Sequence, residues 1–175
     1  SSRTSFSSPS DVVVAPDGNV FIADGHNANG NNRVMKLTSD GQFIMSWGQT
    51  GYAPGEFRAL HAIEMDSRGR IFVGDRSNNR VQIFDQEGTH LATWTQFGRP
   101  SGIAFDTNGQ IFVADSESNR MIFGELQNPG WKNGVRFGSA KDGSLRGFID
   151  GTDPEGLAVD ELGNVWAGLT STPIL

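Results

Sequence analysis

Short apolar segments alternate with polar turns along the whole chain. Four times, an apolar segment leads through a polar turn into a second apolar segment, and each turn ends in glycine, at Gly18, Gly69, Gly109 and Gly163. Two short strands joined by a glycine-containing turn are the pattern of a β-hairpin. No segment keeps an apolar period of about 3.6 residues, so the pattern predicts an all-β protein without crossover helices.

The spacing of these hairpins indicates a repeat architecture. The turn glycines are 51, 40 and 54 residues apart (18 to 69, 69 to 109, 109 to 163), which brackets the roughly 40–50 residues of a four-stranded propeller blade. Apolar alternation over residues 33–47 and 80–94 supplies a third and a fourth strand for the first two repeats. We therefore expect one β-propeller domain over residues 1–175, with repeats at about 6–56, 57–98, 99–152 and 153–175.

The third and fourth repeats depart from this pattern. In the third, an inserted stretch at residues 127–134 follows Arg120-Met-Ile-Phe123. Insertions in a propeller fall on one face, so this stretch is either part of a binding rim or a tolerated surface loop. In the fourth, few residues follow the second strand, so we expect about four blades with the last one incomplete. Unclosed blade edges invite pairing, which predicts an open arc that forms a homo-oligomer through its blade edge, or a fragment of a larger propeller.

Charge and composition narrow the range of partners. The formal net charge is −6, and an acidic surface repels phosphate backbones, so nucleic acid is not expected as a partner. The chain has no cysteine, which excludes disulfides and thiolate metal sites. No stretch approaches the roughly 20 apolar residues needed to span a bilayer, so no membrane partner is expected.

An aspartate and an arginine recur in the first three repeats, as the pairs Asp24 and Arg33, Asp75 and Arg80, and Asp115 and Arg120. One copy in each blade favours an architectural role over a catalytic one. The carboxylate can accept backbone N–H bonds in the turn, and the guanidinium can bridge to the carboxylate.

The motif Asp75-Arg-Ser-Asn-Asn-Arg80-Val81, with a variant that starts at Asp115, resembles the NHL repeat. Other stretches, among them Leu60-His61-Ala and Asn128-Pro-Gly-Trp-Lys, resemble the bacterial peptidylglycine α-amidating lyases. This resemblance implies a six-bladed propeller, of which this chain would be an arc or a fragment, and favours a secreted or periplasmic protein. It also implies a zinc ion held at the central channel by three histidines, with a tyrosine and an arginine beside the substrate.

Only part of that lyase site carries over to this sequence. His61 occupies a zinc-ligand position, whereas the equivalent positions in the other repeats hold Ser10, Ser101 and Glu155. The position of the catalytic tyrosine holds His26. Because a catalytic zinc takes three protein ligands, the site is expected to be incomplete in this chain unless another chain contributes. Zinc and calcium are the candidate metals.

Strand starts of successive blades converge on a propeller axis, so one ring of side chains is expected at the channel mouth, made of Ser10, His61, Ser101 and Glu155. Within it, His61 and Glu155 are candidate metal ligands, against the alternative of an ordinary polar channel lining. His26 is a candidate catalytic base or further ligand beside them. Further candidates for a ligand-binding rim are Arg76, Glu117 and Trp131, against the alternative of a solvated rim.

Two functions are consistent with these residues. The first is an NHL-repeat propeller that binds a protein, a peptide or a small molecule at the channel mouth, with the catalytic site of the related lyases incomplete. The alternative is a zinc-dependent lyase acting on peptidyl-α-hydroxyglycine, with its site completed by another chain. There, zinc would polarise the substrate hydroxyl and a nearby base would take its proton.

Overall fold

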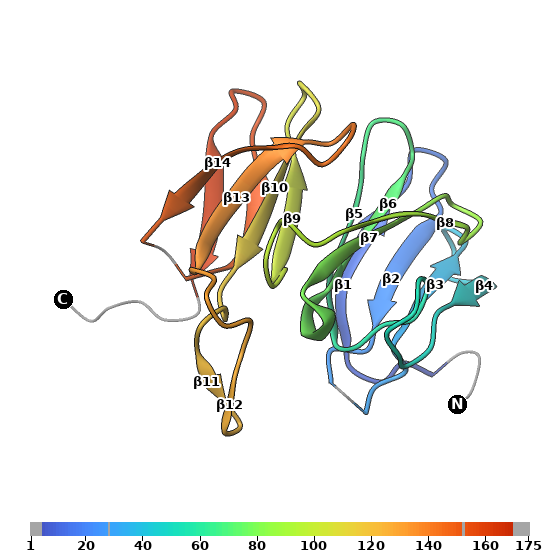
Figure 1. Cartoon of the computed structure of the whole chain (residues 1–175). Helices are drawn as coiled ribbons and strands as arrows, with labels where there is room; N and C mark the ends of the chain where they lie inside the picture. Colours follow the sequence, from blue (N-terminus) through green and yellow to red (C-terminus); the bar gives the residue numbers. More distant parts are fainter. Residues whose placement is uncertain (1–4, 28, 152, 170–175) are drawn as a thin grey trace.

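The computed structural model describes residues 5–27, 29–151 and 153–169, and it is built almost entirely of antiparallel strands. Three four-stranded sheets and a two-stranded sheet follow one another along an arc (Figure 1). The first blade contains β1 (Pro9–Val14), β2 (Val20–Asp24), β3 (Arg33–Leu37) and β4 (Phe43–Trp47). The second contains β5 (Leu60–Met65), β6 (Ile71–Asp75), β7 (Arg80–Phe84) and β8 (His90–Trp94), with a 3₁₀ turn, η1 (Arg76–Asn78), between β6 and β7.

The third blade is interrupted. Its sheet contains β9 (Gly102–Phe105), β10 (Gln110–Asp115), β13 (Gly134–Ser139) and β14 (Leu145–Asp150). Between β10 and β13 the chain leaves the sheet and forms a separate small hairpin, β11 (Met121–Ile122) and β12 (Glu125–Leu126). The last sheet described contains β15 (Pro154–Val159) and β16 (Val165–Leu169).

The first strand of each sheet lies next to the first strand of the following sheet, in the order β1, β5, β9 and β15. Each complete sheet then runs outward from that strand, and in the first two blades the strands follow one another as a simple meander. Sheets arranged in this way around a common axis are the blades of a β-propeller. The prediction of an all-β fold with four-stranded blades is confirmed.

Apolar side chains fill the space between neighbouring blades. Between the first and second blades the fully buried large side chains include Phe21, Phe57, Leu60, Ile63 and Phe84. Between the second and third blades Phe72 packs edge-on against Trp94, with ring centroids 5.5 Å apart, beside the buried Ile111. Burial of each such side chain contributes about 1.5–3 kcal/mol. This packing fixes the relative positions of the loops that connect the strands.

The recurring aspartates have the architectural role that the repeat predicts. Asp75 is fully buried, and its carboxylate accepts the backbone N–H of Arg58 at 2.7 Å and the Nε–H of Arg80 at 2.7 Å. In the first blade, Arg33 Nε lies 3.1 Å from Asp24 Oδ2. Asn32 and Asn79, which precede the two arginines, have φ values of 49° and 52°, in the left-handed region that asparagine tolerates better than most residues.

The third blade corrects the sequence interpretation in one respect. By its motif, the segment that starts at Arg120 aligns with the third strands that start at Arg33 and Arg80, but β13 takes that place and pairs with β10 along its whole length. Arg120 pairs instead with the half-buried Asp153, and Asp115 is bridged by Arg136, with Nη1 and Oδ2 3.3 Å apart. Arg136 stands opposite Val113, the register position that Gln82 occupies opposite Val73 in the second blade. The inserted segment therefore starts before β11, earlier than expected.

No helix within the described ranges has the length and apolar character that a membrane crossing requires.

Candidate functional site

The first strand of each blade starts, and the second strand ends, at the same end of the blades. The residues at these positions therefore lie close together. Antiparallel pairing places Leu60 opposite Asp75, so His61 at the start of β5 lies near η1, which follows β6. The β15 start brings Glu155 to the same end, and the residues after β2 and β10 bring His26 and Glu117. We call the group formed here the channel-mouth cluster; it consists of His26, His61, Arg76, Arg99, Glu117 and Glu155.

His61 and Glu155 are the centre of this cluster. His61 Nε2 lies 2.8 Å from Glu155 Oε1, and its Nδ1 lies 2.6 Å from the backbone carbonyl oxygen of Ser101. The carbonyl oxygen accepts hydrogen bonds and has no proton to donate. The structure thus brings His61, Ser101 and Glu155 into direct contact, and the fourth residue expected in the channel ring, Ser10, lines a hollow with them.

Glu155 is held in its charged form. Burial alone would raise the pKa of Glu155, but hydrogen bonds from His61 and Ser116, together with the charges of His61 and Arg76, lower that pKa to about 2. Ser116 donates through Oγ to Glu155 Oε2, and Arg76 Nη1 lies 3.3 Å from Glu155 Oε1. The carboxylate is therefore ionised at neutral pH and has its oxygens occupied.

Arg76 and Arg99 form the cationic side of the cluster. Arg99 Nε lies 3.0 Å from Glu117 Oε2, and Arg76 Nη1 lies 3.6 Å from Glu117 Oε1. Arg99 also donates from Nη1 to the backbone oxygen of Arg76 at 3.0 Å. Arg76 is only 8% exposed, and its Nε makes no hydrogen bond within the described part of the chain. Burial lowers the pKa of Arg76, an effect that the charge of Glu117 opposes.

His26 faces two of the other basic groups of the cluster, His61 and Arg76. Its ring centroid is 4.8 Å from that of His61, and its Nε2 lies 3.5 Å from Arg76 Nη2. Burial lowers the pKa of His26, and the neighbouring charges of His61 and Arg76 lower it further. His26 is therefore neutral at pH 7, with a nitrogen able to accept a proton or a hydrogen bond.

A hollow of about 420 Å³ opens beside this cluster. We call it the mouth hollow; its lining includes His26, Ala59, Arg76, Arg99, Glu117, Ile122, Phe123 and Gln127. One wall is the β11–β12 hairpin, which projects away from the third blade at the lower end of Figure 1. At its tip Phe123 is fully exposed, with φ 51°, and is followed by Gly124 with φ 83°.

The remaining candidates lie further from this hollow. Ser10 donates to the backbone oxygen of Leu60 at 2.9 Å and shares a smaller hollow of about 250 Å³ with His61, Ser101 and Glu155. Trp131 lies elsewhere: its ring stacks on Arg136, with the guanidinium carbon 4.7 Å from the ring centroid. Trp131 therefore packs on the third blade and does not line the mouth hollow.

Sequence reasoning missed Arg99 and Ser116. Ser116 directly follows the recurring Asp115, the same place that Arg76 takes after Asp75. That position faces the mouth in both blades, so the repeat alignment contained the signal. Arg99 precedes the third hairpin unit, and its ion pair with Glu117 joins residues 18 positions apart, which no local pattern indicates.

The described residues do not supply a zinc site of the kind implied by the resemblance. No group of three or more His, Asp or Glu side chains suited to a metal ion occurs among residues 5–27, 29–151 and 153–169. His61 Nε2 and Glu155 Oε1 bond directly to each other at 2.8 Å, and a catalytic zinc takes three protein ligands, so these two residues alone do not complete a site. Metal binding by these two residues stays a prediction that needs further ligands.

Comparison with known proteins agrees with this architecture. The family model "NHL repeat" matches residues 6–37, 57–84 and 97–122. Human NHL repeat-containing protein 3 is 36% identical over 105 residues, which cover 57% of this chain and 30% of that protein. Peptidyl-glycine alpha-amidating monooxygenase A of Xenopus laevis is 41% identical over 93 residues, which cover 50% of this chain and 10% of that protein. The chain thus spans less than a third of either relative.

Solved structures show the same fold at low sequence identity. The WD40 repeats of RRP9 superpose with a TM-score of 0.64 at 21% identity, covering 86% of this chain and 42% of that one. An inactive virginiamycin B lyase of Staphylococcus aureus with Quinupristin gives a TM-score of 0.64 at 18% identity, covering 91% of this chain and 48% of that one. This chain therefore carries NHL repeats, folded as the blades of a β-propeller.

Proposed function

We propose that this chain is a binding module that takes a peptide segment in the mouth hollow. The observation that carries the proposal is Arg76, which lines the hollow, is 8% exposed and has an Nε without a hydrogen-bond partner among the described residues. A buried donor left unpaired costs about 1–3 kcal/mol. Nε is shielded from solvent in this arrangement, so a carbonyl or carboxylate oxygen of a ligand would satisfy it after a small shift of the Arg76 side chain.

The rest of the cluster holds Arg76 in place for that contact. Its Nη1 lies within 3.6 Å of Glu117 and 3.3 Å of Glu155, and its backbone oxygen accepts from Arg99. A side chain positioned in this way loses little further conformational freedom when a ligand binds. The ion pairs therefore hold the Arg76 guanidinium at the wall of the hollow.

The β11–β12 hairpin supplies an apolar contact. Phe123 is fully exposed at its tip and lines the mouth hollow together with Ile122. A large apolar side chain in water adds nothing to folding, and exposed aromatic residues are enriched where proteins bind partners. A ligand with an apolar side chain next to a main-chain carbonyl would contact Phe123 with the first and Arg76 with the second. A peptide has both groups.

The experiment is a selection of short peptides on the immobilised chain from a random display library, followed by fluorescence polarisation with each selected peptide. Phe123→Ser is expected to weaken binding by about tenfold or more, as for an anchor residue of an interface. The matched control is Leu162→Ser, because Leu162 is equally a large exposed side chain but lies in the β15–β16 turn. Peptides that bind Phe123→Ser as well as they bind the unaltered chain would refute the proposal.

The second candidate is the lyase activity, which the relatives favour. Proteins named peptidyl-alpha-hydroxyglycine alpha-amidating lyase in Caenorhabditis elegans and Drosophila melanogaster are 33% and 34% identical, each over 45% of this chain. A zinc site here needs ligands beyond His61 and Glu155. Metal content of the purified chain separates the two candidates, with His61→Ala compared with His90→Ala, since His90 lies in β8 and contacts Thr93 and Phe84 there. Stoichiometric metal lost in His61→Ala alone would favour the lyase.

We also propose that the exposed blade faces take part in self-association. Val12 and Val14 on β1 are 55% and 62% exposed, and Trp166 on β16 is 63% exposed. Large apolar side chains exposed on a sheet face are typical of a protein interface. Light scattering coupled to size exclusion tests this: Trp166→Ser is expected to shift a dimer toward monomer, and a monomeric unaltered chain would refute it.

A further inference from the structure

A second hollow lies at the end of the blades opposite the channel-mouth cluster. It is formed by three turns, at residues 66–70, 105–109 and 139–146, which connect strands of the second and third blades. These turns lie at the upper end of Figure 1, whereas the β11–β12 hairpin lies at the lower end. We call this cavity of about 400 Å³ the basic hollow.

The charge of the basic hollow is opposite to that of the chain. Its ionisable lining side chains are four cations and two carboxylates, namely Arg68, Arg70, Lys141, Arg146, Asp66 and Asp106. The hollow thus has a formal excess of two positive charges within a chain of net charge −6. Such a local reversal of sign concentrates small anions at that point of the surface.

The two carboxylates are directed at their own turns. Asp66 Oδ1 accepts the backbone N–H groups of Arg68 and Arg70, at 3.0 and 2.9 Å. Asp106 Oδ1 accepts the backbone N–H groups of Asn108 and Gln110, at 2.9 and 2.7 Å. Their charges are compensated locally by these bonds, so they oppose an incoming anion less than free carboxylates would.

Arg70 is fixed at the edge of the hollow. Its Nε and Nη2 donate to Asp66 Oδ2 at 2.9 and 2.6 Å, and Nη2 also donates to the backbone oxygen of Ala140. Its Nη1 makes no hydrogen bond within the described ranges, so one nitrogen of a positioned guanidinium stays available. The contact with Ala140 also joins the second blade to the third across the hollow.

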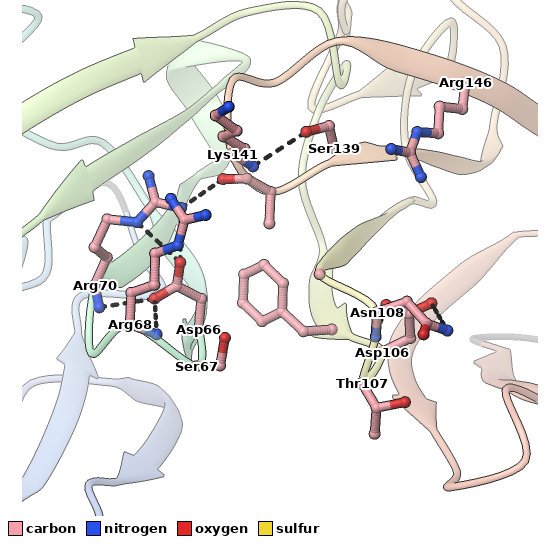
Figure 2. A pocket seen from close by; sticks show the side chains of 13 residues that line it. Asp66, Ser67, Arg68, Arg70, Asp106, Thr107, Asn108, Ser139, Lys141 and Arg146 are labelled. Atoms are coloured by element: carbon pink, nitrogen blue, oxygen red, sulfur yellow. Dashed lines mark hydrogen bonds and ion pairs between the residues drawn. The ribbon is translucent and has the colours of Figure 1, made fainter.

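The other three cations of the basic hollow have no bonded partner among the described residues. Among the residues that the structure describes, the side chains of Arg68, Lys141 and Arg146 make no hydrogen bond and no ion pair within 4 Å. Figure 2 shows Arg68 and Arg70 on one side of the hollow, Arg146 on the other and Lys141 at its upper edge. Thr107 and Asn108 lie at the lower edge and add polar groups. Cations from two blades therefore surround one space.

We propose that the basic hollow binds a single phosphate monoester group, carried by a small organic molecule or by a phosphorylated side chain. A phosphate monoester has about −1.5 to −2 charges at pH 7 and three strong acceptor oxygens, which matches several guanidinium donors better than a carboxylate does. An extended polyanion would also meet the acidic remainder of the surface, which disfavours nucleic acid. This site is independent of the mouth hollow, so its failure would leave the peptide-binding proposal untouched.

The test is isothermal titration calorimetry in phosphate-free buffer with N-acetyl-O-phosphoserine amide, its unphosphorylated counterpart and inorganic phosphate. The double variant Arg68→Gln/Arg146→Gln removes two cations from the hollow. The control is Arg58→Gln/Lys132→Gln, which removes two cations that pair elsewhere, with Tyr52 and Asp150. The near-ultraviolet circular dichroism of each variant checks that the fold is retained.

We expect saturable binding of the phosphorylated compound. The hollow variant should weaken this binding about tenfold or more, and the control variant should change it little. If inorganic phosphate binds with equal affinity, the site recognises the phosphate ion itself. If the phosphoserine compound binds more tightly, the site recognises an organic phosphate. Both results support the site. The proposal is overturned by equal binding of the unphosphorylated compound, by equal loss in the control variant, or by absence of saturable heat. Displacement of the phosphoserine compound by a lower concentration of poly(U) RNA would also overturn it.

Discussion

His61 and Glu155 form a hydrogen-bonded ion pair between the second blade and the β15–β16 sheet, with His61 Nε2 2.8 Å from Glu155 Oε1. The other ring nitrogen lies 2.6 Å from the carbonyl oxygen of Ser101. Since the pKa of Glu155 is lowered to about 2, the carboxylate has no proton to give at neutral pH. Both ring nitrogens of His61 therefore face oxygen atoms that can only accept a hydrogen bond.

The first prediction concerns acid stability. The pKa of Glu155 falls from 4.5 to about 2 on folding, so the folded state holds the charged form more strongly than the unfolded state. The stabilisation is complete above pH 4.5 and is lost as the pH falls toward 2. Because Glu155 is partly exposed and therefore screened, we expect about 1–2 kcal/mol from it.

The measurement is the free energy of unfolding by urea at several pH values, for the unaltered chain and for Glu155→Gln. The difference between the two should be largest above pH 4.5 and shrink as the pH approaches 2. Glu87→Gln serves as control, since the Glu87 side chain is 74% exposed at its contact with Lys36. A difference that stays constant across this range would contradict the ion pair.

The second prediction concerns His26. Burial lowers the pKa of His26, and the charges of His61 and Arg76 add to that effect. Replacement of Arg76 by Gln removes one of these charges, so the pKa of His26 should rise from its value in the unaltered chain. A pH titration of the His26 ring protons by nuclear magnetic resonance measures it. Lys141→Gln, at the opposite end of the blades, should leave that titration unchanged, and an equal shift there would argue against a direct effect of Arg76.

The repeat made most of the fold readable from the sequence. Hairpins with glycine turns predicted four-stranded blades, and strand starts aligned by the repeat predicted that His61, Ser101 and Glu155 would meet although they are far apart in the chain. These inferences succeed because each blade buries its apolar faces against its neighbours in the same way, so aligned positions have equivalent places around the axis.

Contacts that differ from blade to blade could not be predicted from the repeat alignment. In the third blade the local motif ends at Arg120 and would start the third strand there, whereas β13 is the strand that pairs with β10 and buries apolar residues such as Val135. The basic hollow was missed because its cations come from two turns with unrelated sequences, at residues 66–70 and 139–146. Local patterns determine hairpins, but side chains brought together by packing between blades need the assembled structure.

The third prediction compares Arg120 and Arg136, the two arginines of the third blade that are candidates to pair with Asp115. Asp115 is fully buried, and Arg136 is its guanidinium partner. Loss of one member of a buried ion pair leaves the other uncompensated, so Arg136→Met should destabilise the fold by roughly 3 kcal/mol. Arg120 pairs with Asp153 on the surface, with 43% of its side chain exposed, so Arg120→Met should cost less than about 1 kcal/mol. Chemical denaturation of both variants measures the contrast, and a reversed order would show that Arg120 bridges Asp115.

The fourth prediction separates stability from binding at the hairpin tip. Phe123 is fully exposed and has φ 51°, a conformation that costs a non-glycine residue roughly 1–2 kcal/mol. Asparagine tolerates this conformation better, so Phe123→Asn should leave the melting temperature unchanged or raise it, while peptide binding at the mouth hollow falls. Met121→Asn is the control, since Met121 is also exposed but lies outside the mouth hollow. Phe123 is strained and exposed to solvent and contributes nothing to folding, so a contact with a ligand explains its presence. A large loss of thermal stability in Phe123→Asn would contradict that explanation.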